Sequence, residues 1–429
     1  MRLQGRISRR GVLSGLAGAA GAFAVGSPPV VGQAKPRVVV IGGGAGGGTA
    51  ARYIAKDAAG AIDVTLVEPN RRFVTCFHSN LYLGGYKTLD EIGHGYEAMA
   101  RTSGLTLAHD TATAIDRDTR LVRLASGQAL GYDRLVLSPG IDLRYDSVPG
   151  WGQDHEQRMP HAWKAGPQTQ LLRAQLDAVP DGGVIVVIAP PNPYRCPPGP
   201  YERVSMFAAQ LTRAGKTRCK IFIIDPKESF SKQALFEQGW ERHYRGMVEW
   251  LGPRVHDGVK RVDPARMTVE TGFETYRDAA LVNVIPAQWA GAIARNAGLV
   301  NASGYCPIDP ASMRSMMDPN IFVIGDACIA GDMPRSAFSA NSQAKVVAMT
   351  VRGELTGSRM FPARYANTCW SLLWDDDTIK VGGQFEPRPD KITSTIPFIS
   401  QPGDSAETRR QNQAENMGWY SAIVADIFG

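Results

Sequence analysis

The feature that most constrains the fold is a glycine-rich turn that directly follows a short apolar strand. Residues 37–41 read Arg-Val-Val-Val-Ile, which is typical of a buried parallel strand, and Gly42, Gly44 and Gly47 then complete the pattern G-x-G-x-x-G. The first glycine permits a tight turn, the second lets the backbone approach a pyrophosphate, and the third lets the next helix pack close to the strand. The phosphates are expected at the N-terminus of that helix, where free N–H groups favour anions.

An acidic residue at the end of the next strand supports a dinucleotide site. The apolar segment 64–67 ends at Glu68, where a carboxylate is expected to bind the ribose hydroxyls of the adenosine. Glycines alone are weak evidence, but the order strand, glycines, helix, strand and acid is much more specific. The alternative is a glycine-rich turn without a ligand. The sequence therefore predicts a nucleotide-binding α/β domain that begins near Lys35.

A second α/β unit lacks this fingerprint. Residues 182–188 and 219–225 are predicted strands, and 201–214 a predicted helix. The turn between them, residues 189–200, contains six prolines where a second G-x-G-x-x-G would be expected. Proline has no N–H and a fixed φ, so this turn is not suited to wrap a pyrophosphate. The unit has the shape of an NAD(P)H domain without its binding site, unless nicotinamide binds by another route.

A later strand is expected to return the chain to the first sheet. Residues 320–324 are apolar and end at Gly325 and Asp326, and this Asp is placed to bind the ribityl or pyrophosphate part of a flavin nucleotide. The 429 residues suffice for two or three domains. The predicted organisation is a signal peptide over 1–34, a discontinuous FAD-binding domain over 35–150 and 280–350, a second Rossmann-like domain over 151–279, and a C-terminal interface domain over 351–429.

The C-terminal part lacks nucleotide signals and is rich in large aromatic residues. Trp370, Trp374, Trp419 and Tyr420 suit a domain that covers a flavin. Residues 384–408 are rich in Pro, Ser and charge, which predicts a long surface excursion. We expect no amphipathic membrane-binding helix between residues 350 and 429.

The N-terminus carries a targeting signal. Arg9 and Arg10 form a twin-arginine pattern before a weakly apolar run, which predicts export to a periplasm-like compartment; an uncleaved membrane anchor is the alternative. The formal charge of +6 falls to +2 once the four arginines of residues 1–34 are removed. A nearly neutral mature chain gives no reason to expect nucleic acid, and no later segment is apolar and long enough to span a membrane.

The six cysteines exclude two familiar metal groups. They form no C-x-x-C pair, no zinc spacing and no C-x-x-C-H haem site, so neither metal nor haem is expected in this chain. Cys219, Cys306 and Cys328 are interpreted as small buried residues.

The remaining cysteines lie in segments that carry a family resemblance. The chain from Lys35 to Gly429 resembles the flavoprotein subunit of flavocytochrome c sulfide dehydrogenase. The segments are Thr75-Cys76, Arg195-Cys196-Pro-Pro-Gly-Pro-Tyr-Glu-Arg203, Gly325-Asp-Ala-Cys-Ile329, Ser339-Ala-Asn-Ser-Gln343 and Asn367-Thr-Cys369. The resemblance implies a glutathione-reductase-like α/β fold with two dinucleotide-binding domains, covalent FAD, a redox disulfide and a separate c-type cytochrome subunit in a heterodimer.

The resemblance also assigns roles to three cysteines. Cys76 would form the thioether link to FAD, and Cys196 and Cys369 would form the redox-active disulfide. The alternatives are a buried structural thiol at Cys76 and an inert structural disulfide for the pair. Sulfide would attack one sulfur of the disulfide, and two electrons would pass to FAD and then to the cytochrome, yielding sulfur or polysulfide. The sequence leaves open which cysteine takes the sulfur.

Three polar residues are further candidates. Glu202 is a candidate proton acceptor for sulfide, or alternatively an acid that complements a helix N-terminus. Lys345 could face the pyrimidine end of the flavin, or be a solvated helix lysine. His78 could assist flavin attachment, or be an ordinary loop histidine.

Three other functions compete with sulfide:cytochrome c oxidoreduction. A sulfide:quinone oxidoreductase shares the fold and cysteine chemistry but needs an apolar membrane-facing surface. A pyridine-nucleotide disulfide reductase is disfavoured by the missing second fingerprint. A non-catalytic accessory flavoprotein of a sulfur-oxidising complex would keep the fold but would not be reduced by sulfide.

Overall fold

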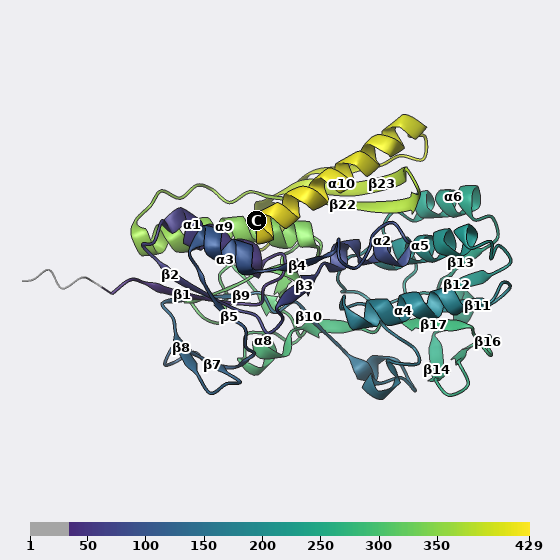
Figure 1. The fold of residues 1–429 in the computed structure, drawn as a ribbon, viewed down its shortest axis with the longest axis horizontal. Coiled ribbons are helices and arrows are strands. Elements are labelled where there is room, and N and C mark those ends of the chain that lie inside the picture. The colour runs from purple at the N-terminus through teal and green to yellow at the C-terminus, as the bar shows by residue number, and fades with distance from the viewer. Residues whose placement is uncertain (1–33) are drawn as a thin grey trace, which may run out of the picture. The chain divides into compact units, whose positions relative to one another are not determined.

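Two parallel sheets organise the chain, and they lie at the left and right of Figure 1. The structure is a computed structural model that describes residues 34–429, so the predicted signal peptide lies outside the described residues except for Ala34. The first sheet has the order β20-β9-β1-β2-β5 and is parallel throughout. Its strands are β1 (Arg37–Ile41), β2 (Asp63–Val67), β5 (Thr106–Ala108), β9 (Arg134–Leu137) and β20 (Ile321–Val323).

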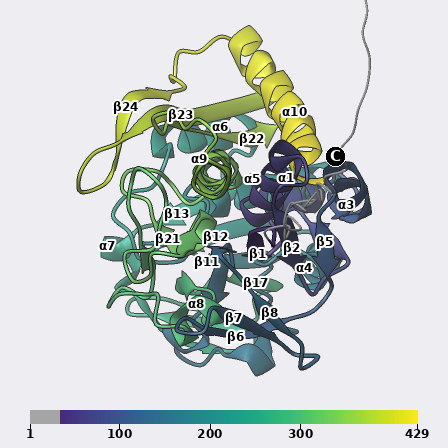
Figure 2. The ribbon, with the colours of Figure 1, turned by 90° about the vertical axis from the view of Figure 1, so that its left-hand side faces the viewer.

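The glycine turn joins β1 to helix α1 (Gly47–Ala58) as the fingerprint predicts. Gly42 has φ +94°, and a Cβ added at Gly47 would lie 1.8 Å from the Gly42 carbonyl oxygen. Glycine is therefore required at both positions for the helix to approach the strand. The pairing of β20 with β9 confirms that the segment after Asn320 returns to the first sheet. Helices α3 (Glu97–Ser103) and α9 (Ala337–Thr356) pack against α1 (Figure 2).

The second sheet has the order β13-β12-β11-β17 and is also parallel. Its strands are β11 (Val184–Ile188), β12 (Lys220–Ile224), β13 (Val248–Leu251) and β17 (Leu281–Val284). Because β17 belongs to this sheet, the predicted boundary at residue 279 is too early, and the chain leaves the second unit after Val284. The associated helices are α4 (Pro167–Ala178), α5 (Gly199–Arg213), α6 (Gln233–His243) and α7 (Pro253–His256).

Short elements complete both units. Antiparallel strands form one sheet of β6 (Ala112–Asp116), β7 (Leu121–Leu124) and β8 (Ala129–Gly131), and another of β14 (Val259–Asp263), β15 (Thr268–Thr271) and β16 (Thr275–Tyr276). Paired short strands are β3 (Arg72–Val74) with β4 (Gly93–Gly95), β10 (Ile141–Leu143) with β18 (Gln288–Ala290), and β19 (Cys306–Pro307) with β21 (Cys328–Ile329). The remaining helices are α2 (Ser79–Leu83) and α8 (Ala292–Asn296).

The C-terminal part is an antiparallel sheet covered by a long helix. The sheet contains β22 (Tyr365–Trp374), β23 (Asp377–Pro387) and β24 (Ile392–Ile399), and α10 spans Ala406–Phe428. The surface excursion predicted for 384–408 is wrong as an irregular segment, because residues 384–387 belong to β23, 392–399 form β24 and 406–408 begin α10. Residues 392–399 read Ile-Thr-Ser-Thr-Ile-Pro-Phe-Ile, and their β-branched side chains favour a strand, while Pro397 is tolerated because β24 is an edge strand.

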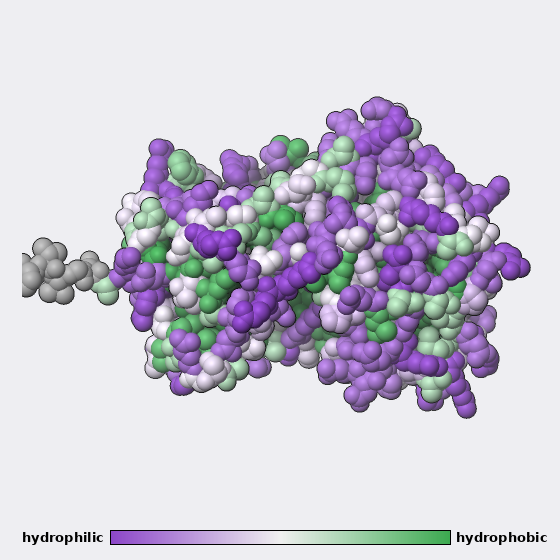
Figure 3. All heavy atoms as spheres, in the orientation of Figure 1, coloured by the Kyte–Doolittle hydropathy of each residue, from purple (hydrophilic) through white to green (hydrophobic). Residues whose placement is uncertain are grey.

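Helix α10 buries polar side chains in its first half and apolar ones in its second. Its buried side chains are Arg409, Asn412 and Asn416, followed by Tyr420, Ile423, Ile427 and Phe428. Hydrophilic residues cover its outer end (Figure 3). Within residues 34–429, no helix combines the length and the apolar character needed to cross a bilayer.

The C-terminal sheet contacts both nucleotide units. Strand β22 packs on α5 of the second unit and on α9 of the first, and α10 packs on β23 and α1. Strand β22 therefore lies between the unit that carries the glycine turn and the unit that carries the proline-rich turn.

Candidate active site

A cavity of about 390 Å³ lies at the carboxyl ends of β1 and β20 and forms the candidate nucleotide site. We call it the nucleotide cavity. Its lining includes the glycine turn from Gly42 to Gly46, the acid Glu68, and Gly325 with Asp326. Gly47 serves the packing of α1 and is not among the lining residues. Two segments separated by more than 250 positions thus build one cavity, as the sequence predicts.

The cavity fits a dinucleotide at its glycine end. In the described part of the chain, the amides of Gly44, Ala45 and Gly46 donate to no other protein group, so they are free to bind phosphate oxygens. Gly44 and Phe73 both line the cavity, and a Cβ added at Gly44 would lie 3.4 Å from the Phe73 ring. Glycine at this position therefore leaves space in the cavity that a side chain would fill. Glu68 is held at the rim because its Oε2 accepts from the Gly43 amide at 2.8 Å.

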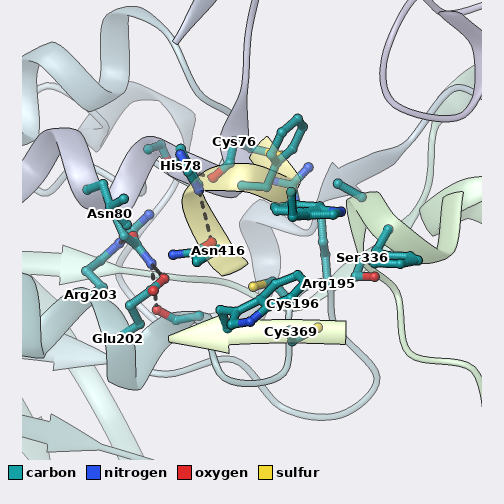
Figure 4. Close-up of a pocket in the computed structure, with 18 of the residues that line it drawn as sticks. Cys76, His78, Asn80, Arg195, Cys196, Glu202, Arg203, Ser336, Cys369 and Asn416 are labelled. Atoms are coloured by element: carbon teal, nitrogen blue, oxygen red, sulfur yellow. Dashed lines mark hydrogen bonds between the residues drawn. The ribbon is translucent and has the colours of Figure 1, made fainter. Parts of the chain in front are cut away.

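A second, smaller cavity of about 70 Å³ brings three cysteines together (Figure 4). We call it the thiol cavity. Cys76 begins a single 3₁₀ turn after β3, Cys196 lies in the proline-rich turn before α5, and Cys369 lies on β22. The two cavities adjoin, because both are lined by Cys76, Phe77, Arg195, Ser336 and Ala337.

All six cysteines are free thiols in this structure. Cys196 and Cys369 line the same cavity, and their disulfide stays a prediction. Cys219, Cys306 and Cys328 are buried outside both cavities, as expected of core residues. Among the described residues, no cluster of three or more His, Cys, Asp or Glu side chains could hold a metal ion.

Glu202 lies in the first turn of α5 and also lines the thiol cavity. Its Oε2 accepts from Asn80 Nδ2 at 2.9 Å, and its Oε1 accepts from the Leu372 amide at 3.0 Å. Burial raises the pKa of this carboxyl, while Asn80 and Leu372 oppose the rise. Glu202 can therefore serve as a proton acceptor, since it borders the cavity, and also as a structural acid in the first turn of α5, since its carboxylate links β22 to that helix.

Sequence reasoning missed three buried cations at the site. Arg203 is 1% exposed and donates to Asn80, Asn283 and the carbonyls of residues 161 and 162, and burial lowers its pKa to about 9. Arg195 lies 3.7 Å from Asp326 and links the two cavities. Lys232 Nζ lies 3.1 Å from the Cys369 carbonyl oxygen. Both arginines flank the motif around Cys196 and could have been suspected, whereas no pattern in the sequence marks Lys232.

Lys345 corrects a prediction. It projects from α9 toward α10, where its Nζ lies 2.5 Å from Asp426 Oδ2, and it lines neither cavity. The ion pair with Asp426 therefore accounts for this lysine, and a place at the pyrimidine end of a flavin does not.

Aromatic side chains form one wall of the thiol cavity. The ring of Trp419 lies 5.4 Å from that of Trp370, 5.6 Å from that of Phe77 and 6.0 Å from that of Phe338. His78 lies beside them, 1% exposed and stacked on Tyr420 at 3.9 Å, so it is a buried residue of the cavity wall and not a loop histidine. The C-terminal aromatics thus enclose the thiols in an apolar setting.

Two buried histidines predict acid sensitivity of the fold. His161 Nδ1 accepts from the Trp163 amide at 2.8 Å, so its ring is neutral, and burial lowers the pKa of His161 and of His78 to about 3. The ordinary pKa of histidine is 6.5. Below that pH the two side chains are protonated in the unfolded state but stay neutral in the folded state. The free energy of unfolding should therefore fall between pH 6.5 and about 3, by up to about 1.4 kcal/mol per pH unit for each histidine.

Denaturant unfolding at a series of pH values tests this expectation. In His161→Gln, the free energy of unfolding should fall less steeply with falling pH, by the contribution of one histidine. His155→Gln, at a partly exposed position, is the control and should behave like the unmodified protein. An unaltered pH dependence in His161→Gln would contradict the assignment of this residue as a buried neutral group.

Family comparisons match three consecutive parts of the chain. The description "Pyridine nucleotide-disulphide oxidoreductase" matches residues 36–186, "Sulfide dehydrogenase [flavocytochrome c] flavoprotein chain, central" matches 169–286, and "Flavocytochrome c sulphide dehydrogenase, flavin-binding" matches 361–428. The last two ranges contain Cys196 and Cys369 respectively.

Individual relatives agree with these matches. The flavoprotein chain of sulfide dehydrogenase [flavocytochrome c] from Chlorobaculum thiosulfatiphilum is 57% identical over 44 residues, which are 10% of this chain and 90% of that sequence. The mitochondrial sulfide:quinone oxidoreductase of Mus musculus is 23% identical over 311 residues, 67% of this chain and 65% of that protein. The match thus spans slightly less than two thirds of that relative.

Solved structures share the fold. The sulfide:quinone oxidoreductase of Aquifex aeolicus superposes with a TM-score of 0.72 at 17% identity, covering 91% of this chain and 92% of that one. A ferredoxin reductase from Rhodopseudomonas palustris gives a TM-score of 0.64 at 20% identity, covering 81% of this chain and 82% of that one. The architecture is therefore that of two-dinucleotide-binding-domain flavoproteins.

Proposed function

Because this chain belongs to the family of flavoprotein chains of flavocytochrome c sulfide dehydrogenase, we propose that it oxidises hydrogen sulfide to elemental sulfur or polysulfide and passes the electrons to a c-type cytochrome. The observation that carries the proposal is the meeting of Cys76, Cys196 and Cys369 where the thiol cavity adjoins the nucleotide cavity. FAD, when bound, supplies a two-electron acceptor beside these thiols.

The chain's own groups suit the sulfur chemistry. In the oxidised protein, Cys196 and Cys369 form a disulfide, and hydrosulfide attacks one of its sulfurs. The product is a persulfide on one cysteine and a thiolate on the other. Glu202, whose pKa burial raises, accepts the proton that hydrogen sulfide or a released thiol gives up. A further sulfide takes the outer sulfur of the persulfide away as polysulfide and leaves both cysteines as thiols or thiolates. Cys196 and Cys369 would return to the disulfide by giving up two electrons, for which bound FAD would supply the acceptor.

Cys76 is proposed to hold FAD covalently. It is among the residues that border both cavities, so a link there would place the isoalloxazine between the dinucleotide cradle and the sulfur pair. A covalent link prevents loss of the cofactor after export, and we propose export by the twin-arginine route to the periplasm. The proposed assembly is a heterodimer with the cytochrome subunit.

Spectroscopic titration tests the function. Adding sulfide to the purified yellow protein without oxygen should bleach the flavin band, and oxidised c-type cytochrome should restore it. A protein that sulfide does not bleach would be an accessory flavoprotein. Rapid reoxidation by a soluble quinone, with no response to cytochrome, would instead favour a sulfide:quinone oxidoreductase, which the similarity to the mouse and Aquifex aeolicus proteins makes the second candidate.

Nicotinamide provides a separate prediction. The turn after β11 carries Cys196 into the thiol cavity, and its prolines withhold the N–H groups that a pyrophosphate needs. NADH or NADPH should therefore reduce the flavin at least about a thousandfold more slowly than sulfide does, a ratio typical of lost substrate binding and orientation. Comparable rates in stopped-flow absorbance would contradict this interpretation.

A further inference from the structure

The two proposed redox cysteines have different surroundings. Asn367 contacts the Cys369 sulfur with both ends of its amide: Nδ2 donates to Sγ at 3.5 Å, and the thiol donates to Oδ1 at 3.8 Å, so only the Nδ2 bond remains for a thiolate. The orientation of that amide is fixed, because Asn367 Oδ1 accepts from Ser336 Oγ at 2.5 Å and from Ser339 Oγ at 3.3 Å. Two hydroxyl donors on the oxygen leave the NH₂ group for the sulfur.

Cys369 also has a buried cation. Lys232 Nζ donates to the Cys369 carbonyl at 3.1 Å and to Ser371 Oγ at 2.8 Å. Lys232 is 5% exposed, and no carboxylate of residues 34–429 forms an ion pair with it within 4.0 Å. A buried ammonium without an ion-pair partner is costly unless a negative charge develops nearby. The groups near Lys232 that can carry such a charge are the Cys369 thiol, the Glu202 carboxyl and the Cys196 thiol.

Cys196 has two arginines nearby, Arg195 and Arg203, but among the described residues no group donates a hydrogen bond to its sulfur. Three of the four residues that follow it are prolines, and the fourth, Gly199, donates its N–H to the Cys196 carbonyl at 2.8 Å. The next two amides, of Tyr201 and Glu202, donate to the Pro198 carbonyl. The N-terminus of α5 therefore offers no free N–H to a thiolate at Cys196.

Charges act in the same direction. Burial raises the pKa of both thiols. For Cys369, Asn367, Lys232 and Ser336 oppose the rise and Glu202 adds to it, whereas for Cys196 the neighbouring Cys369, Glu202 and Cys76 add to it and only Arg195 opposes it.

Resting on the proposed function, we infer that sulfide attacks the Cys196 sulfur and that Cys369 leaves as the thiolate. In thiol–disulfide exchange, the sulfur that is the better thiolate leaves faster. Hydrosulfide forms a bond to Cys196 Sγ, and the Cys196–Cys369 bond breaks with its electron pair going to Cys369. The products are a persulfide on Cys196 and a thiolate on Cys369, which the Asn367 amide contacts and whose backbone carbonyl binds Lys232. The disulfide is the oxidant, so the step balances.

Mass spectrometry locates the sulfur. The oxidised holoprotein is mixed with one equivalent of sulfide without oxygen, quenched with excess iodoacetamide and digested. The peptide with Cys196 should gain the mass of one sulfur atom, and that with Cys369 only the alkyl group. An extra sulfur on Cys369 would overturn the inference alone, whereas an intact disulfide and no added sulfur would overturn the proposed function together with it.

Alkylation of the reduced protein tests the thiolate without sulfide. The charged or titratable groups around Cys369 are Lys232, Glu202 and Cys196. At neutral pH, Cys369 should be alkylated about tenfold faster than Cys196. Lys232→Met should lower the alkylation rate of Cys369 about tenfold and shift the pH dependence of that rate to higher pH. Lys232→Arg, which keeps the cation, should restore most of the rate.

A matched control separates charge from position. Lys380 lies opposite Trp370 on β23, so Lys380→Met removes a lysine from the same sheet and should leave both rates unchanged. Asn367→Ala carries the same expectation as Lys232→Met and replaces it if that variant does not fold. Faster alkylation of Cys196, or an unchanged rate for Cys369 in both variants, would overturn the inference.

Discussion

Replacing Cys196 or Cys369 with serine is expected to lower the rate of flavin reduction by sulfide at least about a thousandfold, because serine cannot form the disulfide that accepts the nucleophile. Bound FAD should remain, since neither residue lies among the glycines and acids of the nucleotide cavity. Stopped-flow absorbance at the flavin band measures both the rate and the retained colour.

Cys219→Ser is the matched control for this pair. Cys219 is 1% exposed and lines neither cavity, so its replacement tests the general cost of losing a buried thiol. Sulfide should reduce the flavin of Cys219→Ser at the same rate as that of the unmodified protein. Wild-type rates in Cys196→Ser or Cys369→Ser would remove the disulfide from the mechanism.

Replacing Cys76 with serine should abolish the covalent flavin almost completely. In the unmodified protein, flavin fluorescence should survive a denaturing gel and stay with the polypeptide. In Cys76→Ser the fluorescence should leave the band, because the only proposed bond to the cofactor is absent, while the native protein should still bind FAD through the free amides of the glycine turn.

Cys219→Ser again serves as the control and should keep its fluorescent band. A band that stays fluorescent in Cys76→Ser would place the covalent link elsewhere. A wild-type band without fluorescence would mean that the chain holds its flavin without a bond, and the sulfide chemistry could then be tested unchanged.

The parts of the fold that follow short-range rules could be predicted from the sequence. The glycine turn, the strand that ends at Glu68 and the return strand before Asp326 each carry a local pattern, and the structure has all three. The prolines after β11 likewise indicated that the second unit has no second glycine fingerprint. These features depend on backbone geometry, which a few residues determine.

Features that depend on tertiary packing could not be predicted in this way. The polar composition of residues 384–408 concealed a strand, because β24 is an edge strand that pairs with β23 and leaves most of its side chains partly or fully exposed. Lys232 and Arg203 resemble surface residues until the fold buries them. Lys345 is exposed on α9, as the alternative of a solvated helix lysine has it, and its ion pair with Asp426, more than 80 positions away, could not be predicted from the sequence.

The central claim is that Cys196 and Cys369 form one sulfide-reactive pair, and peptide mapping of the oxidised protein tests it most directly. Without reductant, digestion should yield the two cysteine peptides joined by a disulfide, and one equivalent of sulfide should release them. Two separately alkylated peptides in the oxidised protein, or a link that sulfide leaves intact, would contradict the claim.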